Sequence, residues 1–222
     1  MVYILPLLSV LLGFGFALWF TPKSKKQLKL LLAFSGAFLL SITVLHLLPE
    51  IYETGKQHVG IFIILGILLQ ILLEYFSQGA EHGHVHKHGD MQHIPWLLFG
   101  SLCLHAFLEG IPISNHNPLA MGIAIHHLPI AVILTTFFLQ SNLNKGSVTL
   151  FMLIFSVMTP LGTYLAVYIP QLHQYQAELT AIVIGILFHI SSTIIFESNE
   201  GHKFNIAKIS MIILGVLLAY FL

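Results

Sequence analysis

Charged side chains are scarce in this chain of 222 residues: they make up 8% of it, and none is an arginine. A soluble globular domain carries about a quarter charged residues, so an integral membrane protein is expected. Nine basic and nine acidic side chains balance, which leaves no basic excess for binding nucleic acid. The single cysteine, Cys103, lies inside an apolar run, so no disulfide can form within the chain.

The first twenty residues lack both a basic segment ahead of the apolar run and a small-residue cleavage site. A removable signal peptide would carry both features. We therefore predict that this run is a first membrane helix.

Long apolar runs are what the chain has in abundance. They recur at about 2–20, 30–51, 59–79, 95–114, 119–140, 148–170, 179–199 and 204–222. Each is close to the roughly 20 residues that a membrane-spanning helix needs. The sequence predicts one all-α integral membrane domain over 1–222, with eight transmembrane helices and a histidine-rich cytoplasmic loop at 80–94.

The lysines predict the orientation of these helices. With the N-terminus outside, eight of the nine lysines fall in inner loops and only Lys56 lies outside. This positive-inside bias predicts that both termini are outside. Glu50 then lies near the outer mouth and Glu197 near the inner mouth, at the ends of two helices of opposite direction. Such a relation is typical of inverted repeats in secondary transporters.

Two histidines flank the polar turn SNHNP at equal distances. His105 lies ten residues before Asn115, and His126 lies ten residues after His116. At 1.5 Å per residue both lie about 15 Å below the turn, in the middle of a hydrocarbon core about 30 Å thick. Ionisable side chains at that depth indicate a functional site by default.

His105 and Glu109 are spaced i, i+4 and therefore share one helix face. Imidazole nitrogen with carboxylate oxygen suits divalent zinc, iron or manganese, and zinc is the simplest choice. The alternative is a hydrogen-bonded pair that only stabilises packing. His126 is the expected third ligand. His127 lies about 100° around the same helix, so it is either a partner of the site, a proton acceptor or a structural residue.

Other polar residues are candidates for a permeation pathway. Thr159 either bonds back to its own helix or lines the pathway. His189 lies at mid-depth with Ser192 on roughly the same face, and the pair either contacts metal or serves close packing. His46 and Glu50 are spaced i, i+4 at the outer end of their helix. Either the two residues help metal to enter, or Glu50 is an ordinary acidic residue at the membrane interface.

The loop EHGHVHKHGDMQH carries alternating histidines, His82, His84, His86 and His88, followed by His93. Histidines in such a segment bind transition metals weakly and without strict specificity. We expect this loop to capture, buffer or sense metal on the cytoplasmic side.

Eight predicted spans, the histidine-rich loop, HAFLEG followed by HHLP, and the segments HLLPE and MTPLG together resemble the ZIP (Zrt/Irt-like) family of metal-ion transporters. The likeness extends over essentially the whole chain. It implies an inverted-repeat bundle that imports divalent metals such as zinc, iron or manganese, and two bundles that move relative to each other.

The resemblance also implies a set of ligands. The family's first metal position matches His105, Glu109 and His126, and its further ligand falls on Ile130, which cannot coordinate.

The family's second metal position matches Ala106, His127 and Thr159, of which only His127 is a strong donor. The resemblance therefore implies one principal metal position, completed by water or His127.

We expect a transporter of the bacterial inner membrane, not an enzyme, with a divalent transition metal as cargo and no organic cofactor. Its partners are the metal ions and the lipid bilayer, without nucleic acid, and a homodimer is compatible with the sequence. Acid should weaken metal binding because His105 binds only when neutral. The alternatives are a membrane metal sensor or store on the same scaffold, and an intramembrane zinc hydrolase using Glu109 as base.

Overall fold

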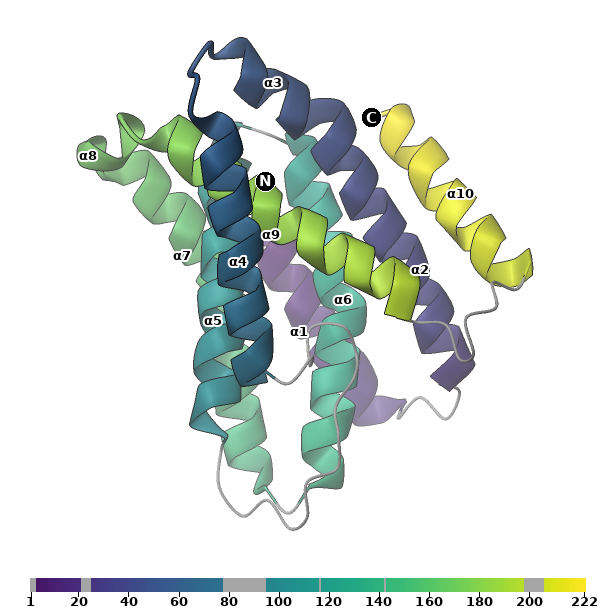
Figure 1. The fold of residues 1–222 in the computed structure, drawn as a ribbon. Coiled ribbons are helices and arrows are strands. Elements are labelled where there is room, and N and C mark those ends of the chain that lie inside the picture. Colours follow the sequence, from purple (N-terminus) through teal and green to yellow (C-terminus); the bar gives the residue numbers. More distant parts are fainter. Residues whose placement is uncertain (1–2, 21–24, 78–94, 116, 142, 198–205) are drawn as a thin grey trace.

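The structure, a computed structural model, describes residues 3–20, 25–77, 95–115, 117–141, 143–197 and 206–222. Within these ranges every regular element is a helix, which confirms the predicted all-α class (Figure 1). The elements are α1 (Ile4–Trp19), α2 (Lys25–Ile42), the π-helical turn η1 (Thr43–Leu47), α3 (Leu48–Glu53), α4 (Val59–Ser77), α5 (Trp96–Gly110), the 3₁₀ turn η3 (Ile111–Asn115), α6 (Asn117–Gln140), α7 (Lys145–Tyr168), α8 (Pro170–His173), α9 (Gln176–Glu197) and α10 (Ile206–Tyr220).

Within the described residues, six helical stretches are long and apolar enough to cross a membrane, and they coincide with six of the predicted runs. They are Gln27–Glu53, Val59–Ser77, Trp96–Ile113, Pro118–Gln140, Lys145–Tyr168 and Gln176–Phe196. The first and last runs are helical too, but α1 has 16 residues and α10 has 15. At 1.5 Å per residue these two measure about 24 and 22 Å, less than the hydrocarbon core. The chain is a multi-pass membrane protein.

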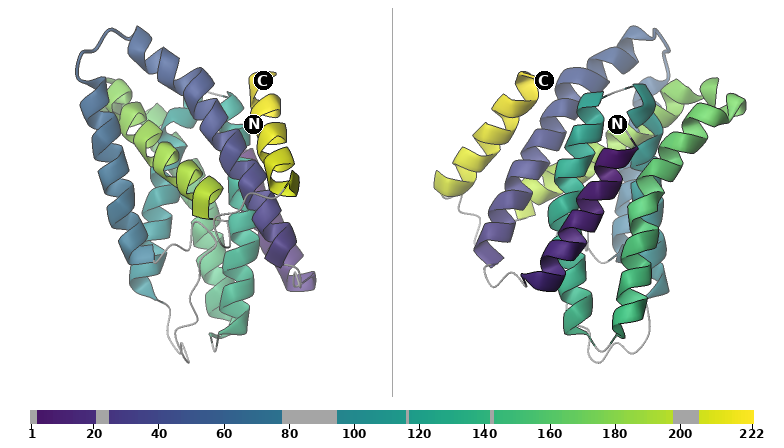
Figure 2. Two further views of the ribbon diagram at one scale, coloured as in Figure 1. Left: turned by 45° about the vertical axis from the view of Figure 1, so that its right-hand side comes forward. Right: turned by 180° about the vertical axis from the view of Figure 1, so that it is seen from behind.

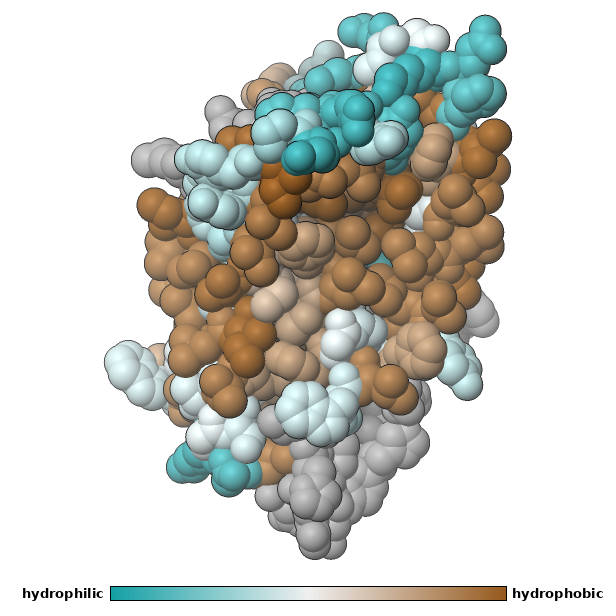
Figure 3. All heavy atoms as spheres, turned by 90° about the vertical axis from the view of Figure 1, so that its left-hand side faces the viewer, coloured by the Kyte–Doolittle hydropathy of each residue, from teal (hydrophilic) through white to brown (hydrophobic). Residues whose placement is uncertain are grey.

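The outer surface carries a broad apolar belt. Large hydrophobic side chains are exposed along α1, α4, α7 and α10. Figure 3 shows this belt across the middle of one face, with hydrophilic residues gathered at the end above it. An exposed apolar area of this extent is unsuited to water and fits a lipid environment.

Eight of the described helices pack in two sets of four, which leaves out only the short α3 and α8. In the first set α1 lies along α6 and α7, and α5 lies along α7 (Figure 2). In the second set α2 lies along α9 and α10, and α4 lies along α9. The two sets meet where α2 packs on α6 and α4 packs on α5.

Glycines bring the backbones together inside each set. Gly66 of α4 and Gly185 of α9 face each other so closely that a methyl group on either would overlap a backbone carbonyl of the other helix. Gly110 of α5 and Gly162 of α7 do the same in the first set. Small residues permit such close approach between membrane helices. Between the sets, Gly122 meets only the ends of side chains.

The long second span contains a local change of helix type. The N–H of Leu48 donates to the carbonyl of Thr43, five residues back, which is a π-helical bond. Pro49 follows immediately and has no N–H to continue the α-helical ladder. His46 in this wider turn and Glu50 in the first turn of α3 both line one pocket.

The glycine contact between α4 and α9 generates a stability prediction. Gly185→Ala should destabilise the protein by about 1–3 kcal/mol, the usual range for overpacking, because the new methyl group would meet the Ile63 carbonyl. Gly100→Ala is the matched control, since a Cβ there has no neighbour within 4 Å. Thermal unfolding in detergent measures both variants. Equal unfolding midpoints would contradict the close approach.

Candidate metal site

Four ionisable side chains meet in the interior of the helix bundle. His105 and Glu109 come from α5, one turn apart, and His126 and His127 come from α6. Their exposed fractions are 3%, 0%, 1% and 2%. Only η3 and one further residue separate α5 from α6 in the sequence, and the two helices run in opposite directions (Figure 1), which brings the two histidine motifs to the same depth. This is the juxtaposition that the mirrored spacing predicts.

His105, Glu109 and His126 each offer one ligand atom, and these three atoms lie within 4.8 Å of one another. Within the group, His105 Nε2 is 3.2 Å from Glu109 Oε1. Small side-chain rotations would bring two nitrogens and one oxygen to the roughly 2.0–2.2 Å that zinc requires. The structure therefore brings together the three residues predicted as ligands, and we call them the trio.

His127 contacts the trio from the side. Its Nε2 lies 3.0 Å from Glu109 Oε2, in the position of a hydrogen-bond donor. Its ring lies 5.6 Å from the ring of Phe155, centroid to centroid. A donor on Oε2 orients the carboxylate and leaves Oε1 toward His105. Such partners of a ligand commonly fix its orientation.

Helix α7 supports the end of α5 that carries Glu109. The Thr163 hydroxyl donates to the carbonyl of Gly110 at 2.7 Å, and it also reaches the Thr159 carbonyl at 3.1 Å. Sequence reasoning missed Thr163. No signal in the sequence pointed to this bond, because Thr163 and Gly110 are 53 residues apart and meet only through the packing of α7 on α5.

Thr159 does not bond back to its own helix. Its side chain is 1% exposed, and its hydroxyl has no hydrogen-bond partner among the described residues. Other helical threonines, such as Thr135, donate to the carbonyl four residues back. Of the two alternatives for Thr159, the back-bonded one is therefore not what the structure shows.

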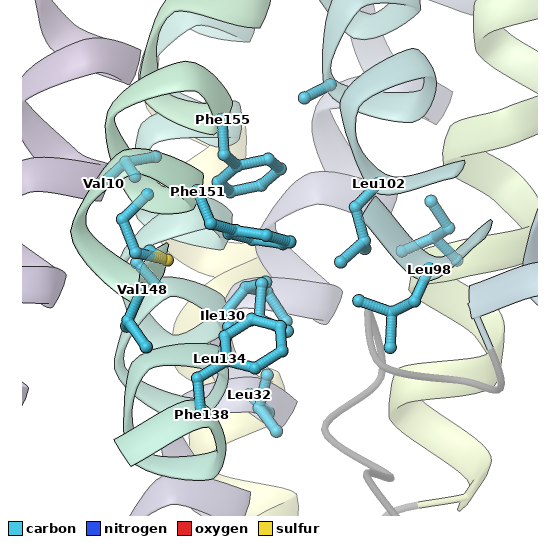
Figure 4. Close-up of a cluster of buried hydrophobic side chains, with 14 of the residues drawn as sticks. Val10, Leu32, Leu98, Leu102, Ile130, Leu134, Phe138, Val148, Phe151 and Phe155 are labelled. Carbon is cyan, nitrogen blue, oxygen red and sulfur yellow. The ribbon is translucent and has the colours of Figure 1, made fainter. Parts of the chain in front are cut away.

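Ile130 and Ala106, the two positions at which the resemblance implies ligands that this chain lacks, are part of an apolar layer. Ile130 packs with Leu134 and Phe138, and Ala106 belongs to the same buried cluster (Figure 4). These positions serve packing, which leaves His127 as the remaining donor beside the trio.

His189 lies outside the trio, so its predicted contact with metal is not made there. Its Nε2 is 2.6 Å from Glu74 Oε2 on α4. Ser192, one turn further along α9, is half-buried. The sequence offered no sign of this pairing, because Glu74 and His189 are 115 residues apart.

His46 and Glu50 line a pocket of about 460 Å³ at the end of the bundle where α3 meets the start of α6. Its walls are formed by Ile42, Leu45, His46, Leu47, Pro49, Glu50, Glu53, Pro118 and Leu119. Glu53 was not predicted, although its i, i+3 spacing from Glu50 was visible. His46 Nε2 also lies 3.3 Å from the Ala219 carbonyl of α10.

Two other predicted groups cannot be placed. The loop histidines His82, His84, His86, His88 and His93 lie outside the described residues. Glu197 ends α9, and its side chain likewise lies outside what the structure describes.

The bond from Thr163 to α5 generates a second prediction. Thr163→Val should cost about 1–3 kcal/mol, because it withdraws the donor from a buried carbonyl. Thr135→Val is the matched control: Thr135 is equally buried, but its hydroxyl bonds only within its own helix. Unfolding midpoints in detergent measure the difference. A Thr135→Val variant that loses as much stability would contradict the supporting role of Thr163.

Comparison with known proteins adds no identification: no protein-family model matches the chain, and no curated protein matches it. The likeness to metal transporters therefore rests on the sequence motifs, and the chemistry rests on the geometry of the trio.

Proposed function

We propose that this protein imports divalent transition metal ions, zinc first, across a bacterial inner membrane. In this proposal eight helices span the membrane with both termini outside, and the trio is the transport site. The single observation that carries the proposal is the convergence of His105, Glu109 and His126 inside a bundle of membrane-spanning helices.

The energetics of the trio favour a cation as its occupant. A carboxylate buried among membrane helices is costly unless charged or hydrogen-bonding partners compensate for lost water. His105 and His127 contact the two oxygens of Glu109. A divalent ion would add a full opposing charge, and two imidazoles with one carboxylate are donors that zinc, iron and manganese accept. In this proposal the ion is the transported cargo, and water or His127 fills the coordination positions that the trio leaves open.

The pocket at α3 is a suitable outer access point. Glu50 and Glu53 attract cations, and His46 adds an imidazole to the same wall. His126 lies seven residues beyond Leu119 on α6, about 10 Å deeper at 1.5 Å per residue. Buried side chains of Ile42, Leu47 and Leu119 form the apolar part of the wall. Metal can reach the trio from here only when these side chains separate.

The two helix sets offer a way to separate them. All four ionisable residues of the site belong to α5 and α6, within the first set, so they would move as one unit. Ile42 and Leu47 belong to the second set, and Leu119 belongs to the first. Backbone contacts at glycines hold each set together, whereas side chains form the boundary. Sliding of one set against the other would open the site to each side in turn.

One rival deserves a direct test, because the trio is closed to solvent and Ile130 supplies no ligand. A membrane metal sensor or store on this scaffold would bind metal without moving it. Accumulation of radioactive zinc inside proteoliposomes separates the two: a transporter accumulates metal, and a sensor only binds it.

The third prediction concerns the trio in that assay. His105→Ala and Glu109→Ala should each reduce zinc uptake to the background of empty liposomes, because either change removes a ligand from a site with few. His173→Ala, which alters an exposed histidine on α8, is the control and should transport normally. Uptake that survives in both trio variants would overturn the assignment of the site.

The fourth prediction concerns the pocket. The double variant Glu50→Gln, Glu53→Gln should raise the half-saturating zinc concentration several-fold with little change in maximal uptake, because the loss of two charges weakens attraction but leaves the trio intact. The difference should shrink at high salt. Glu178→Gln is the control, since Glu178 pairs with Lys56 and does not line the pocket. An equal effect of Glu178→Gln would contradict a specific role for the pocket.

A further inference from the structure

A second histidine–carboxylate pair bridges α4 and α9, away from the trio. His189 Nε2 and Glu74 Oε2 lie 2.6 Å apart, closer than either histidine contact of Glu109, at 3.0 and 3.2 Å. The pair is partly accessible, with side-chain exposures of 21% for His189 and 25% for Glu74. Polar groups of this kind within membrane helices indicate a function by default.

The pair lies where α4 and α9 part. The two backbones touch at Gly66 and Gly185 and cross obliquely there (Figure 1). His189 follows one turn beyond Gly185. On α4, Gln70 and then Glu74 follow Gly66 at successive steps of four residues, so all three share one face. Gln70 is fully buried, and α4 therefore turns a polar edge toward α9 beyond the crossing.

The depth of the pair differs from that of the trio. Glu74 lies three residues before the end of α4, about 5 Å from it at 1.5 Å per residue. His105 lies nine residues after the start of α5, about 14 Å from it. These two helix ends are joined through residues 78–95 and face the side that the proposed orientation makes cytoplasmic. The pair is thus nearer the cytoplasm than the trio is, and α4 packs directly on α5.

We propose that Glu74 and His189 form a second contact for the transported divalent cation, on the cytoplasmic side of the trio. The inference rests on the proposed function and extends it to the release step. Imidazole nitrogen and carboxylate oxygen repeat the donor chemistry of the trio, so the same ion is recognised. Fewer protein ligands make this contact weaker, as a release step requires: an ion must bind well enough to arrive and weakly enough to leave.

The competing explanation is a hydrogen bond that only ties α4 to α9. Glu74→Gln separates the two, because an amide oxygen still accepts from the imidazole N–H but has lost the negative charge that attracts a cation. Under the structural explanation this variant behaves like the parent. Under our proposal it folds normally and loses the weaker cation contact.

The experiment measures zinc binding to the purified full chain by titration calorimetry. The parent protein for this test carries Asn in place of His82, His84, His86, His88 and His93. Zinc binding by these loop histidines then does not obscure binding at the trio and at the Glu74–His189 pair. We expect one tight and one weaker binding step. Glu74→Gln and His189→Gln should each weaken the second step at least about tenfold, a loss seen even for residues one shell removed from a metal. Unfolding midpoints should be retained by Glu74→Gln.

Matched variants make the outcomes distinct. Glu178→Gln removes a different ion pair of α9, with Lys56 at 2.7 Å, and should leave both binding steps unchanged. His105→Ala should abolish only the tight step. Binding by Glu74→Gln that equals the parent, or a matching loss in Glu178→Gln, would overturn the second contact. A tight step that survives His105→Ala would instead overturn the trio and the proposed function.

Discussion

The carboxylate of Glu109 is the constraint around which the bundle is arranged. It has no exposed surface, and it lies between His105 on its own helix and His127 on the next. Such a group is stable among membrane helices only while its partners stay in place. The bond from Thr163 to Gly110 and the close approach of Gly110 to Gly162 fix the turn of α5 that carries Glu109. Packing and site chemistry are therefore parts of one arrangement.

Three groups of polar side chains follow one another along the length of the bundle. An acidic pocket at α3 lies at one end, the trio lies deeper, and the Glu74–His189 pair lies toward the opposite end. The pocket draws on both helix sets, the trio on the first and the pair on the second. Motion of one set against the other would change the distances between these groups without disturbing the glycine contacts inside each set. That combination of rigid units with a side-chain boundary suits a carrier.

Features that depend on local sequence could be predicted, and features that depend on long-range packing could not. All eight predicted apolar runs contain a helix in the described residues, but only six of these helices are long and apolar enough to span a membrane, since α1 and α10 are shorter than predicted. The trio could be predicted, because the i, i+4 spacing of His105 and Glu109 places both on one helix face. The equal distances of His105 and His126 from one turn place these two at the same depth. The pairing of His189 with Glu74 could not be predicted, since the two residues meet only because α4 and α9 cross at their glycines. Likewise, the position of Ile130 in an apolar layer follows from the tertiary fold.

The most direct test of the account is X-ray absorption at the zinc edge, on protein loaded with one zinc ion and carrying Asn at the five loop histidines. The trio predicts a first shell of nitrogen and oxygen at about 2.0–2.1 Å, with the outer-shell scattering of imidazole and no sulfur. His105→Ala and His126→Ala should each reduce the imidazole signal. A spectrum of water oxygens alone, or one that neither substitution changes, would contradict the claim that the trio binds the metal.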